Sequence, residues 1–148
     1  MGGWDIICII SRSSGGNVYQ VTIGKKEKSF GLRVKCIDMG IFDHPIYCVI
    51  GDHKKLQAYL QWKFDDKDID TDTDYGGPPR GQTWFRKGFV PVIWIPRKPA
   101  TPREYSTVAH EAYHAVCKVL RWACIDHTPD TEELIAHSIG HIVNEILK

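Results

Sequence analysis

The stretch Val108–Val116, VAHEAYHAV, places two histidines four residues apart, with a glutamate directly after the first histidine. Four residues make slightly more than one turn of an α-helix, so on a helix the side chains of His110 and His114 lie on one face, about 40° apart. The stretch therefore raises two questions: whether it is helical, and whether the two imidazoles bind one metal ion.

The residues around this stretch predict a helix from Thr101 to about Trp122. Thr101 is a suitable N-cap, a proline follows it, and Glu104 stands where its carboxylate can reach back to the cap. Apolar residues recur at helical spacing and form the core stripe Val108, Ala109, Ala112, Val116, Val119, Leu120 and Ala123. His110 and His114 lie outside this stripe, so we expect their side chains to face solvent.

A second helix is predicted from about residues 128–130 to residue 148, after the break at IDHTPD. Its core stripe consists of Ile135, Ile139, Ile142, Val143 and Ile146. Glu133 lies at the border of this stripe, in line with Gly140 and beside Ala136. Small residues at this border favour a close approach of the two helices and a metal site shared between them.

The first 98 residues predict strands more than helices. Residues 4–10, 18–23, 30–37 and 45–50 are rich in β-forming side chains, and a short amphipathic helix is predicted after the capping residue Asp52. Residues 89–95, FVPVIWI, predict one more strand, which we place at a sheet edge because prolines at positions 91 and 96 cannot donate to a ladder.

Together these elements predict one α+β domain over residues 1–148. An N-terminal antiparallel β-sheet with a short helix (residues 1–98) precedes a C-terminal pair of helices that carries the histidines (residues 99–148).

Composition limits the function classes. Nineteen basic and 18 acidic residues give a formal net charge of +1, which provides no strong field for nucleic acid or an anionic membrane. No apolar stretch approaches the roughly 20 residues of a membrane helix. Five cysteines without a C-x-x-C pair, and an amino terminus without the features of a signal peptide, lead us to expect reduced thiols in a cytoplasmic protein.

The HExxH pattern of residues 110–114 predicts zinc chemistry. Imidazoles one turn apart can bind one Zn²⁺ at about 2.0–2.1 Å, and Glu111, one residue further round the helix, is suited to take a proton from the attacking water. Chance produces the pattern in a chain of this composition with a probability of roughly 1%. The alternative is a pair of solvent-exposed histidines without a metal.

A catalytic zinc site needs a third protein ligand. The extended metzincin motif is absent, since Cys117 and Leu120 occupy the positions of its glycine and its third histidine. The second helix supplies the leading candidate, Glu133, followed by His137. The remaining candidates are His141, Asp126 and His127.

HEAYH (110–114) followed by EELIAHSIG (132–140) resembles the zincin-like metallopeptidases whose third ligand is a glutamate. Among these the chain is similar to small cytoplasmic ImmA/IrrE-type peptidases and to short metallopeptidases carried by bacteriophages. The resemblance covers roughly the last 60 residues. It implies that His110, His114 and Glu133 bind Zn²⁺ and that Glu111 is the general base.

The resemblance also implies that an edge strand beside the motif helix pairs with an extended substrate, and residues 89–95 are the expected strand. His137, one turn after Glu133, is a candidate catalytic residue that stabilises charge on the reacting carbonyl. Arg121 and Tyr113 are alternatives for that role. The alternative roles of His137 are a hydrogen-bond partner of a zinc ligand and a substitute ligand.

We therefore expect a zinc-dependent hydrolase, specifically a metallopeptidase that acts on a peptide or a protein partner. The alternative is a non-catalytic, zinc-stabilised binding protein that occupies a partner. The aromatic residues Trp62, Trp84 and Phe85 are compatible with such a surface, although core packing is their commoner use.

Overall fold

The structure is a computed structural model that describes residues 30–42, 44–71, 80–85 and 90–148. The strands expected at residues 4–10 and 18–23 lie outside the described residues. The described elements are β1 (Arg33–Ile37), β2 (Ile46–Ile50), α2 (His53–Lys63), β3 (Gln82–Trp84), β4 (Val92–Ile95), α3 (Pro102–Trp122) and α4 (Glu132–Leu147), with short 3₁₀ turns at Gly40–Phe42 and Pro129–Thr131.

The four strands form one sheet in the order β1-β2-β4-β3. β1 and β3 are antiparallel to their neighbours, with Val34 opposite Val49 and Thr83 opposite Ile93. β2 and β4 run parallel, because the chain between them crosses over through α2. The expected α+β class, with a sheet and short helix before a pair of C-terminal helices, is confirmed, and the sheet is mixed instead of antiparallel throughout.

The prediction that residues 89–95 form an edge strand is wrong. β4 lies between β2 and β3, and all four of its residues are buried, as is typical of a central strand. Pro91 and Pro96 flank the strand and lie outside its paired residues, so neither interrupts the ladder. The carbonyl of Pro91 still accepts a hydrogen bond from the Tyr47 N–H at 3.1 Å. The edge next to α3 is formed by β3.

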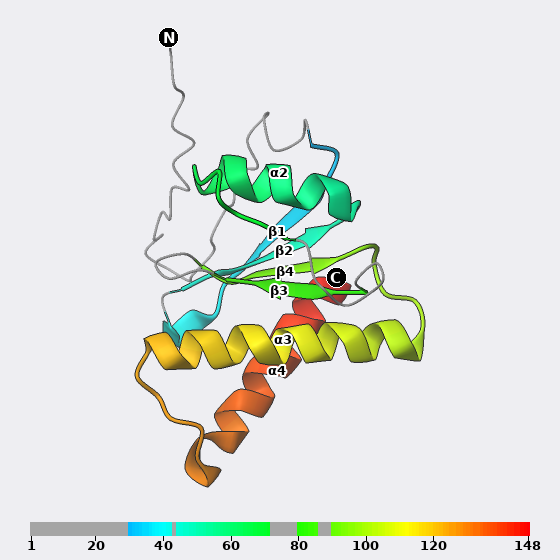
Figure 1. The fold of residues 1–148 in the computed structure, drawn as a ribbon. Helices are drawn as coiled ribbons and strands as arrows, with labels where there is room; N and C mark the ends of the chain where they lie inside the picture. The colour runs from blue at the N-terminus through cyan, green and yellow to red at the C-terminus, as the bar shows by residue number, and fades with distance from the viewer. Residues whose placement is uncertain (1–29, 43, 72–79, 86–89) are drawn as a thin grey trace, which may run out of the picture.

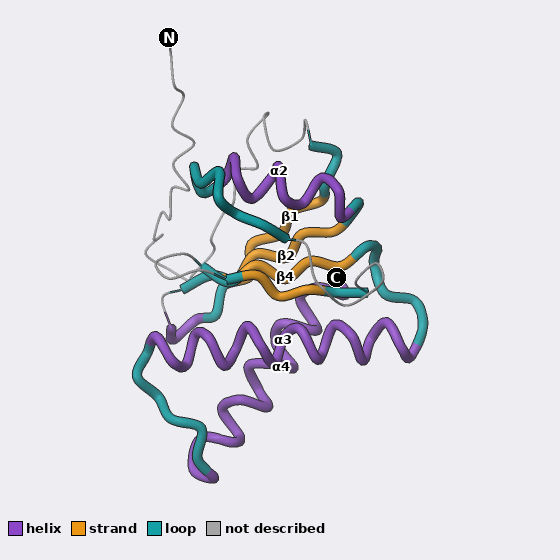
Figure 2. Tube along the Cα trace, viewed as in Figure 1, coloured by secondary structure: helices purple, strands orange, loops and turns teal. Residues whose placement is uncertain are grey.

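The sheet is the middle layer of three, with α2 on one face and both α3 and α4 on the other (Figures 1 and 2). Asp52 caps α2 as predicted, since its carboxylate accepts a hydrogen bond from the Lys54 N–H at 3.0 Å. Leu56, Tyr59 and Leu60 are buried and pack in one core cluster with residues of β1, β2 and β4.

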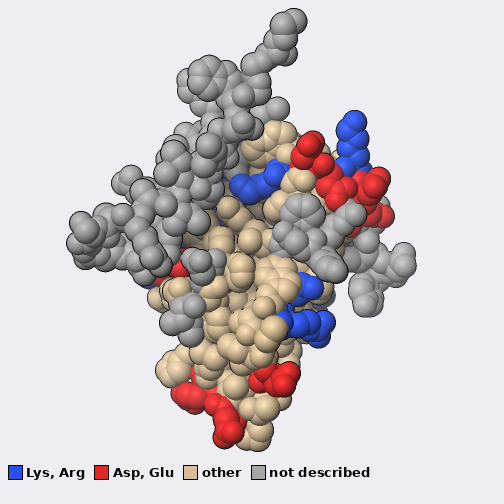
Figure 3. All heavy atoms as spheres, turned by 90° about the vertical axis from the view of Figure 1, so that its left-hand side faces the viewer, with Lys and Arg blue, Asp and Glu red and all other residues tan. Residues whose placement is uncertain are grey.

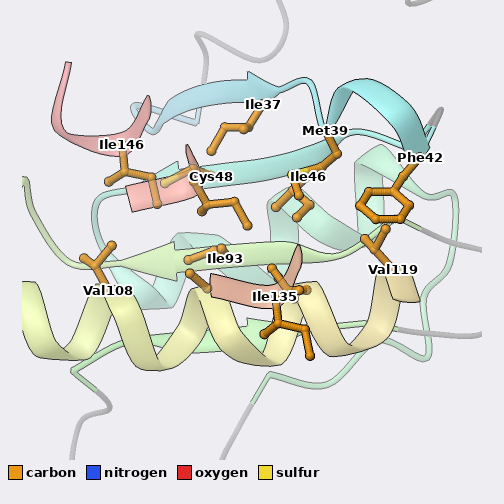
Figure 4. Packing of buried hydrophobic residues seen from close by; sticks show 14 of the residues in the cluster. Ile37, Met39, Phe42, Ile46, Cys48, Ile93, Val108, Val119, Ile135 and Ile146 are labelled. Atoms are coloured by element: carbon orange, nitrogen blue, oxygen red, sulfur yellow. The ribbon is translucent and has the colours of Figure 1, made fainter. Parts of the chain in front are cut away.

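The larger core lies between the sheet and the two C-terminal helices (Figure 4). Strand residues such as Cys48 and Ile93 there meet Val108 of α3 and Ile135 of α4. Burial raises the pKa of the Cys48 thiol to about 12, so it stays protonated at neutral pH. Among the described cysteines, Cys48, Cys117 and Cys124 are free thiols.

The predicted start of α3 is confirmed. Thr101 Oγ1 accepts from the Glu104 N–H at 3.3 Å, and the Glu104 carboxylate accepts from the Thr101 N–H at 3.0 Å, which completes a capping box. Five residues of the predicted stripe are buried, whereas Ala109 is half-buried and Ala123 is exposed at the C-cap. Within the described part of the chain, no helix combines the length and the apolar character needed to cross a membrane.

α3 and α4 cover different halves of the same sheet face. α3 contacts β3 and β4, whereas α4 contacts β1. Two polar contacts join α4 to β1 and the residue after it. The Lys35 ammonium lies 3.5 Å from the Glu145 carboxylate, and His141 Nε2 lies 2.8 Å from the Asp38 carbonyl. The histidine motif on α3 therefore lies on the side of the molecule that carries the edge strand β3, away from the other edge strand, β1.

Candidate metal centre

The two motif histidines point their imidazoles at each other. The Nε2 atoms of His110 and His114 are 3.1 Å apart, and both side chains are exposed on α3. This confirms the expectation that they lie outside the core stripe. At this distance one neutral imidazole can donate a hydrogen bond to the other.

The same separation fits two ligands of one zinc ion. Nitrogen atoms about 2.05 Å from a tetrahedral Zn²⁺ are about 3.3 Å apart, close to the 3.1 Å between His110 Nε2 and His114 Nε2. The distance is thus compatible with two positions of a tetrahedral donor set. To bind one ion, the rings, whose planes meet at 83°, would exchange their mutual hydrogen bond for a common metal.

Glu111 has a different environment from its histidine neighbours. Its side chain is buried, with the residue only 7% exposed, on the side of α3 that faces β3. Thr83 Oγ1 lies 2.7 Å from Glu111 Oε2 and 2.8 Å from the Glu111 carbonyl oxygen, so its one proton is donated to either acceptor. The edge strand thus positions the carboxylate that the sequence suggests as a general base.

A glycine on the edge strand side allows this close contact. A Cβ atom on Gly81 would lie 2.7 Å from Thr107 Cγ2 and 3.1 Å from Glu111 Cγ. Only a residue without a side chain fits this approach of the chain to α3 without displacement.

His110 and Glu111 share a pocket of about 360 Å³ beside the edge strand. Its lining residues are Arg80, Gly81, Arg103, Ser106, Thr107, His110 and Glu111. A histidine, a glutamate and two arginines thus line a single open, polar space. Such a grouping of a base with cationic groups is typical of a site that binds a polar substrate.

The third ligand is not assembled in the described residues. Among them, no group of three or more His, Cys, Asp or Glu side chains lies close enough to hold a metal ion. Glu133 instead pairs with His137, with Oε1 3.0 Å from Nε2, and the two side chains are 82% and 79% exposed. Its role as a ligand, and that of His137 as a catalytic residue, therefore stay predictions.

The prediction that small residues of α4 allow a close approach to α3 is wrong. Ala136 and Gly140 are exposed, and a Cβ on Gly140 would meet no atom within 4 Å. The buried face of α4 consists of Ile135, Ser138, Ile142 and Ile146. The small residues therefore do not mediate the helix contact, because the isoleucines dominate the packing.

Glu133 belongs to an acidic end of the molecule. α4 crosses α3, and its first turns extend beyond α3 on the side away from the sheet (Figure 1). In the space-filling view, acidic side chains gather at this lower end (Figure 3). The exposed acidic residues of this segment are Asp126, Asp130, Glu132 and Glu133.

The other candidates have separate surroundings. His141 contacts the Asp38 carbonyl near β1, which is the sheet edge opposite β3. His127 is exposed in the connection between α3 and α4, and Arg121 is exposed in the last turn of α3. Tyr113 is exposed beside His114, with ring centroids 6.1 Å apart, and a hydrogen bond with the Cys117 thiol raises the Tyr113 pKa.

Sequence reasoning did not identify Thr83, Gly81 or the two arginines of the pocket. No motif marks the first two, because their roles depend on the pairing of β3 with β4 and on its contact with α3. One signal for Arg103 was present: it precedes His110 by seven residues, so both side chains lie on one helix face.

The fold and the site define an α+β protein with an HExxH helix beside a sheet edge. The chain matches no protein-family model, and no curated protein or solved structure matches it. The functional assignment therefore depends on the residues and geometry of the site.

Proposed function

We propose that the protein is a zinc-dependent hydrolase, specifically a metallopeptidase, with His110 and His114 as two zinc ligands and Glu111 as the general base. The observation that carries the proposal is the 3.1 Å separation of the two Nε2 atoms next to a buried carboxylate. A hydrogen bond between two surface imidazoles accounts for the separation by itself, but it does not account for the buried carboxylate beside them.

Each residue has a defined task in this proposal. Zn²⁺, when bound, would polarise a carbonyl and lower the pKa of a water ligand toward about 7. Glu111 takes the proton from the attacking water and transfers it to the leaving amine. Thr83 fixes the orientation of the carboxylate through its hydroxyl, 2.7 Å from Oε2, and the residue is only 7% exposed.

We propose Glu133 as the third zinc ligand, as the resemblance to glutamate-type zincins implies. Recruitment of Glu133 requires the first turn of α4 to move toward the histidines. That movement breaks the exposed ion pair with His137, which contributes about 0–1 kcal/mol, and it also displaces Ile135 of the same turn from the core.

A second candidate is a zinc-stabilised binding protein that occupies a partner without cleaving it. The observation in its favour is Phe85, which is 45% exposed directly after β3. Its ring lies 4.5 Å from the Lys118 ammonium of α3, so an aromatic surface adjoins the motif helix.

The variant Glu111→Gln distinguishes the two candidates. We expect it to keep zinc, measured by elemental analysis, and to lose peptide hydrolysis by roughly 10²–10⁴-fold, because the amide cannot accept the proton. Glu132→Gln, an exposed glutamate of α4, is the matched control and should change neither quantity. Full hydrolysis by Glu111→Gln would exclude the mechanism, and absence of zinc from the purified wild type would exclude the metal site.

A further inference from the structure

The pocket that contains His110 and Glu111 has a cationic wall that the hydrolytic chemistry does not use. Arg80 and Arg103 line it, and among the described residues of its lining Glu111 is the one carboxylate. Glu111 is already hydrogen-bonded to Thr83 and is buried, whereas both arginines are exposed. The described residues of the open part of the pocket therefore present positive charge to a ligand.

The arginines differ from a neighbour that has a structural partner. Arg97 holds the Glu104 carboxylate at 2.6 Å and so supports the start of α3. The ion pairs between described residues include neither Arg80 nor Arg103. Within the described part of the chain, neither guanidinium group thus stabilises the fold through an ion pair.

Helix geometry gives the distance of the cationic wall from the candidate zinc ligands. Arg103 precedes His110 by seven residues on the same helix face, which is about 10 Å along the axis. An extended peptide rises about 3.4 Å per residue, so this span corresponds to about three residues of substrate. A peptide whose scissile bond lies at His110 would bring a side chain three residues away to Arg103.

We infer that Arg103 and Arg80 select peptide substrates with a carboxylate about three residues from the bond that is cleaved. This inference rests on the proposed function. A guanidinium group binds a carboxylate through two parallel N–H···O hydrogen bonds, which gives direction as well as attraction. The hydroxyl of Ser106, in the same pocket lining, adds a further donor.

A peptide fits this pocket better than a nucleic acid does. The formal net charge of the chain is +1, which gives little overall attraction for a polyanion, whereas two arginines suffice for a single carboxylate. The carboxylate can come from an Asp or Glu side chain or from the carboxy terminus of the peptide.

Binding to the zinc-loaded Glu111→Gln variant tests the inference without cleavage. Fluorescently labelled peptides with blocked ends carry either Glu or Gln at each position from two to four residues on either side of a central bond, and a further set has a free carboxy terminus. We expect one Glu position to bind about 10-fold more tightly than its Gln counterpart, with a preference that weakens as salt rises. A preference shown by the free carboxy terminus alone would identify the terminal carboxylate as the source.

Second-site variants show whether the arginines carry this preference. Adding Arg103→Gln or Arg80→Gln should reduce the Glu/Gln ratio toward one. Arg33→Gln removes the same charge from the opposite edge of the sheet and should leave the ratio unchanged. Circular dichroism of each variant checks that the fold is kept.

The outcomes separate the inference from the proposed function. Equal binding of Glu and Gln peptides, a preference that survives Arg103→Gln and Arg80→Gln, or tighter binding of a single-stranded oligonucleotide would overturn the inference. A charge preference that depends on Arg103, in a protein whose wild type hydrolyses no peptide, would support the pocket assignment and contradict the hydrolase.

Discussion

Adjacent residues of the motif have opposite environments. His110 is exposed and Glu111 is 7% exposed, because one step along a helix turns the side chain by about 100°. The step directs the imidazoles to solvent, where an ion can enter, and the carboxylate to the edge strand, where Thr83 fixes it. This environment explains why a buried carboxylate is tolerated beside the core, since buried charges require hydrogen-bond partners.

The Thr83 hydroxyl can be tested by a substitution of the same shape. Thr83→Val removes the donor to Glu111 while it keeps the volume, so the carboxylate stays buried with one partner fewer. We expect the free energy of unfolding to fall by about 1–3 kcal/mol, measured by urea denaturation. Thr83→Ser keeps the hydroxyl and is the control. Equal stability of the Val and Ser variants would show that the hydrogen bond does not support Glu111.

At the scale of elements, local signals predicted α3 well and long-range pairing poorly. Thr101 and Glu104 form the expected cap because a capping box involves only neighbouring residues. β3 is three half-buried residues, too short for any periodicity, so only its pairing with β4 defines it. The prediction that β4 lies at a sheet edge was wrong for the same reason. Pro91 limits pairing only locally, whereas the order of strands in the sheet depends on the whole chain.

The cap of α3 predicts a dependence of stability on pH. Hydrogen bonds from the Ala100 N–H and from Arg97 lower the pKa of Glu104 to about 2, from a usual value of 4.5. A lowered pKa in the folded state means that the contribution is complete above about pH 4.5 and is lost as pH falls toward 2. Wild type should therefore lose its stability advantage over Glu104→Gln across this range, measured by urea denaturation at each pH. A difference that is independent of pH between 5 and 2 would contradict the role of the charge.

Two glycines provide a matched test of how β3 approaches α3. Gly81→Ala places a methyl group 2.7 Å from Thr107 Cγ2, so the chain must shift, and overpacking of this kind costs about 1–3 kcal/mol. Gly140→Ala adds the same methyl group to an open position within α4 and should raise stability by about 0.5–1 kcal/mol. Urea denaturation measures both effects, and two changes of the same sign would show that the contact with α3 is not tight. If Glu111 is the base, Gly81→Ala should also reduce hydrolysis.

At the scale of the whole molecule, the candidate site depends on how two helices share one sheet face. The motif itself was readable from sequence, because His110 and His114 interact within one helix turn. The place of Glu133 was not, since it depends on the angle at which α4 crosses α3 and on the isoleucines that set this packing. The hydrophobic contact between the helices thus decides where a third ligand can come from.

Metal affinity tests the connection between the two helices. If Glu133 completes the zinc site, Glu133→Ala should weaken zinc binding by at least about 10-fold, because loss of even an outer partner of a metal ligand has an effect of this size. Glu132→Ala removes an equally exposed carboxylate from the same turn of α4 and should leave the affinity unchanged. Because zinc binds the folded state, an excess of 100 times its dissociation constant should raise the wild-type free energy of unfolding by about 2.7 kcal/mol, and His110→Ala should abolish this gain. Equal affinities of the Glu132→Ala and Glu133→Ala variants, with a loss in His137→Ala, would assign the third position to the histidine one turn further along α4.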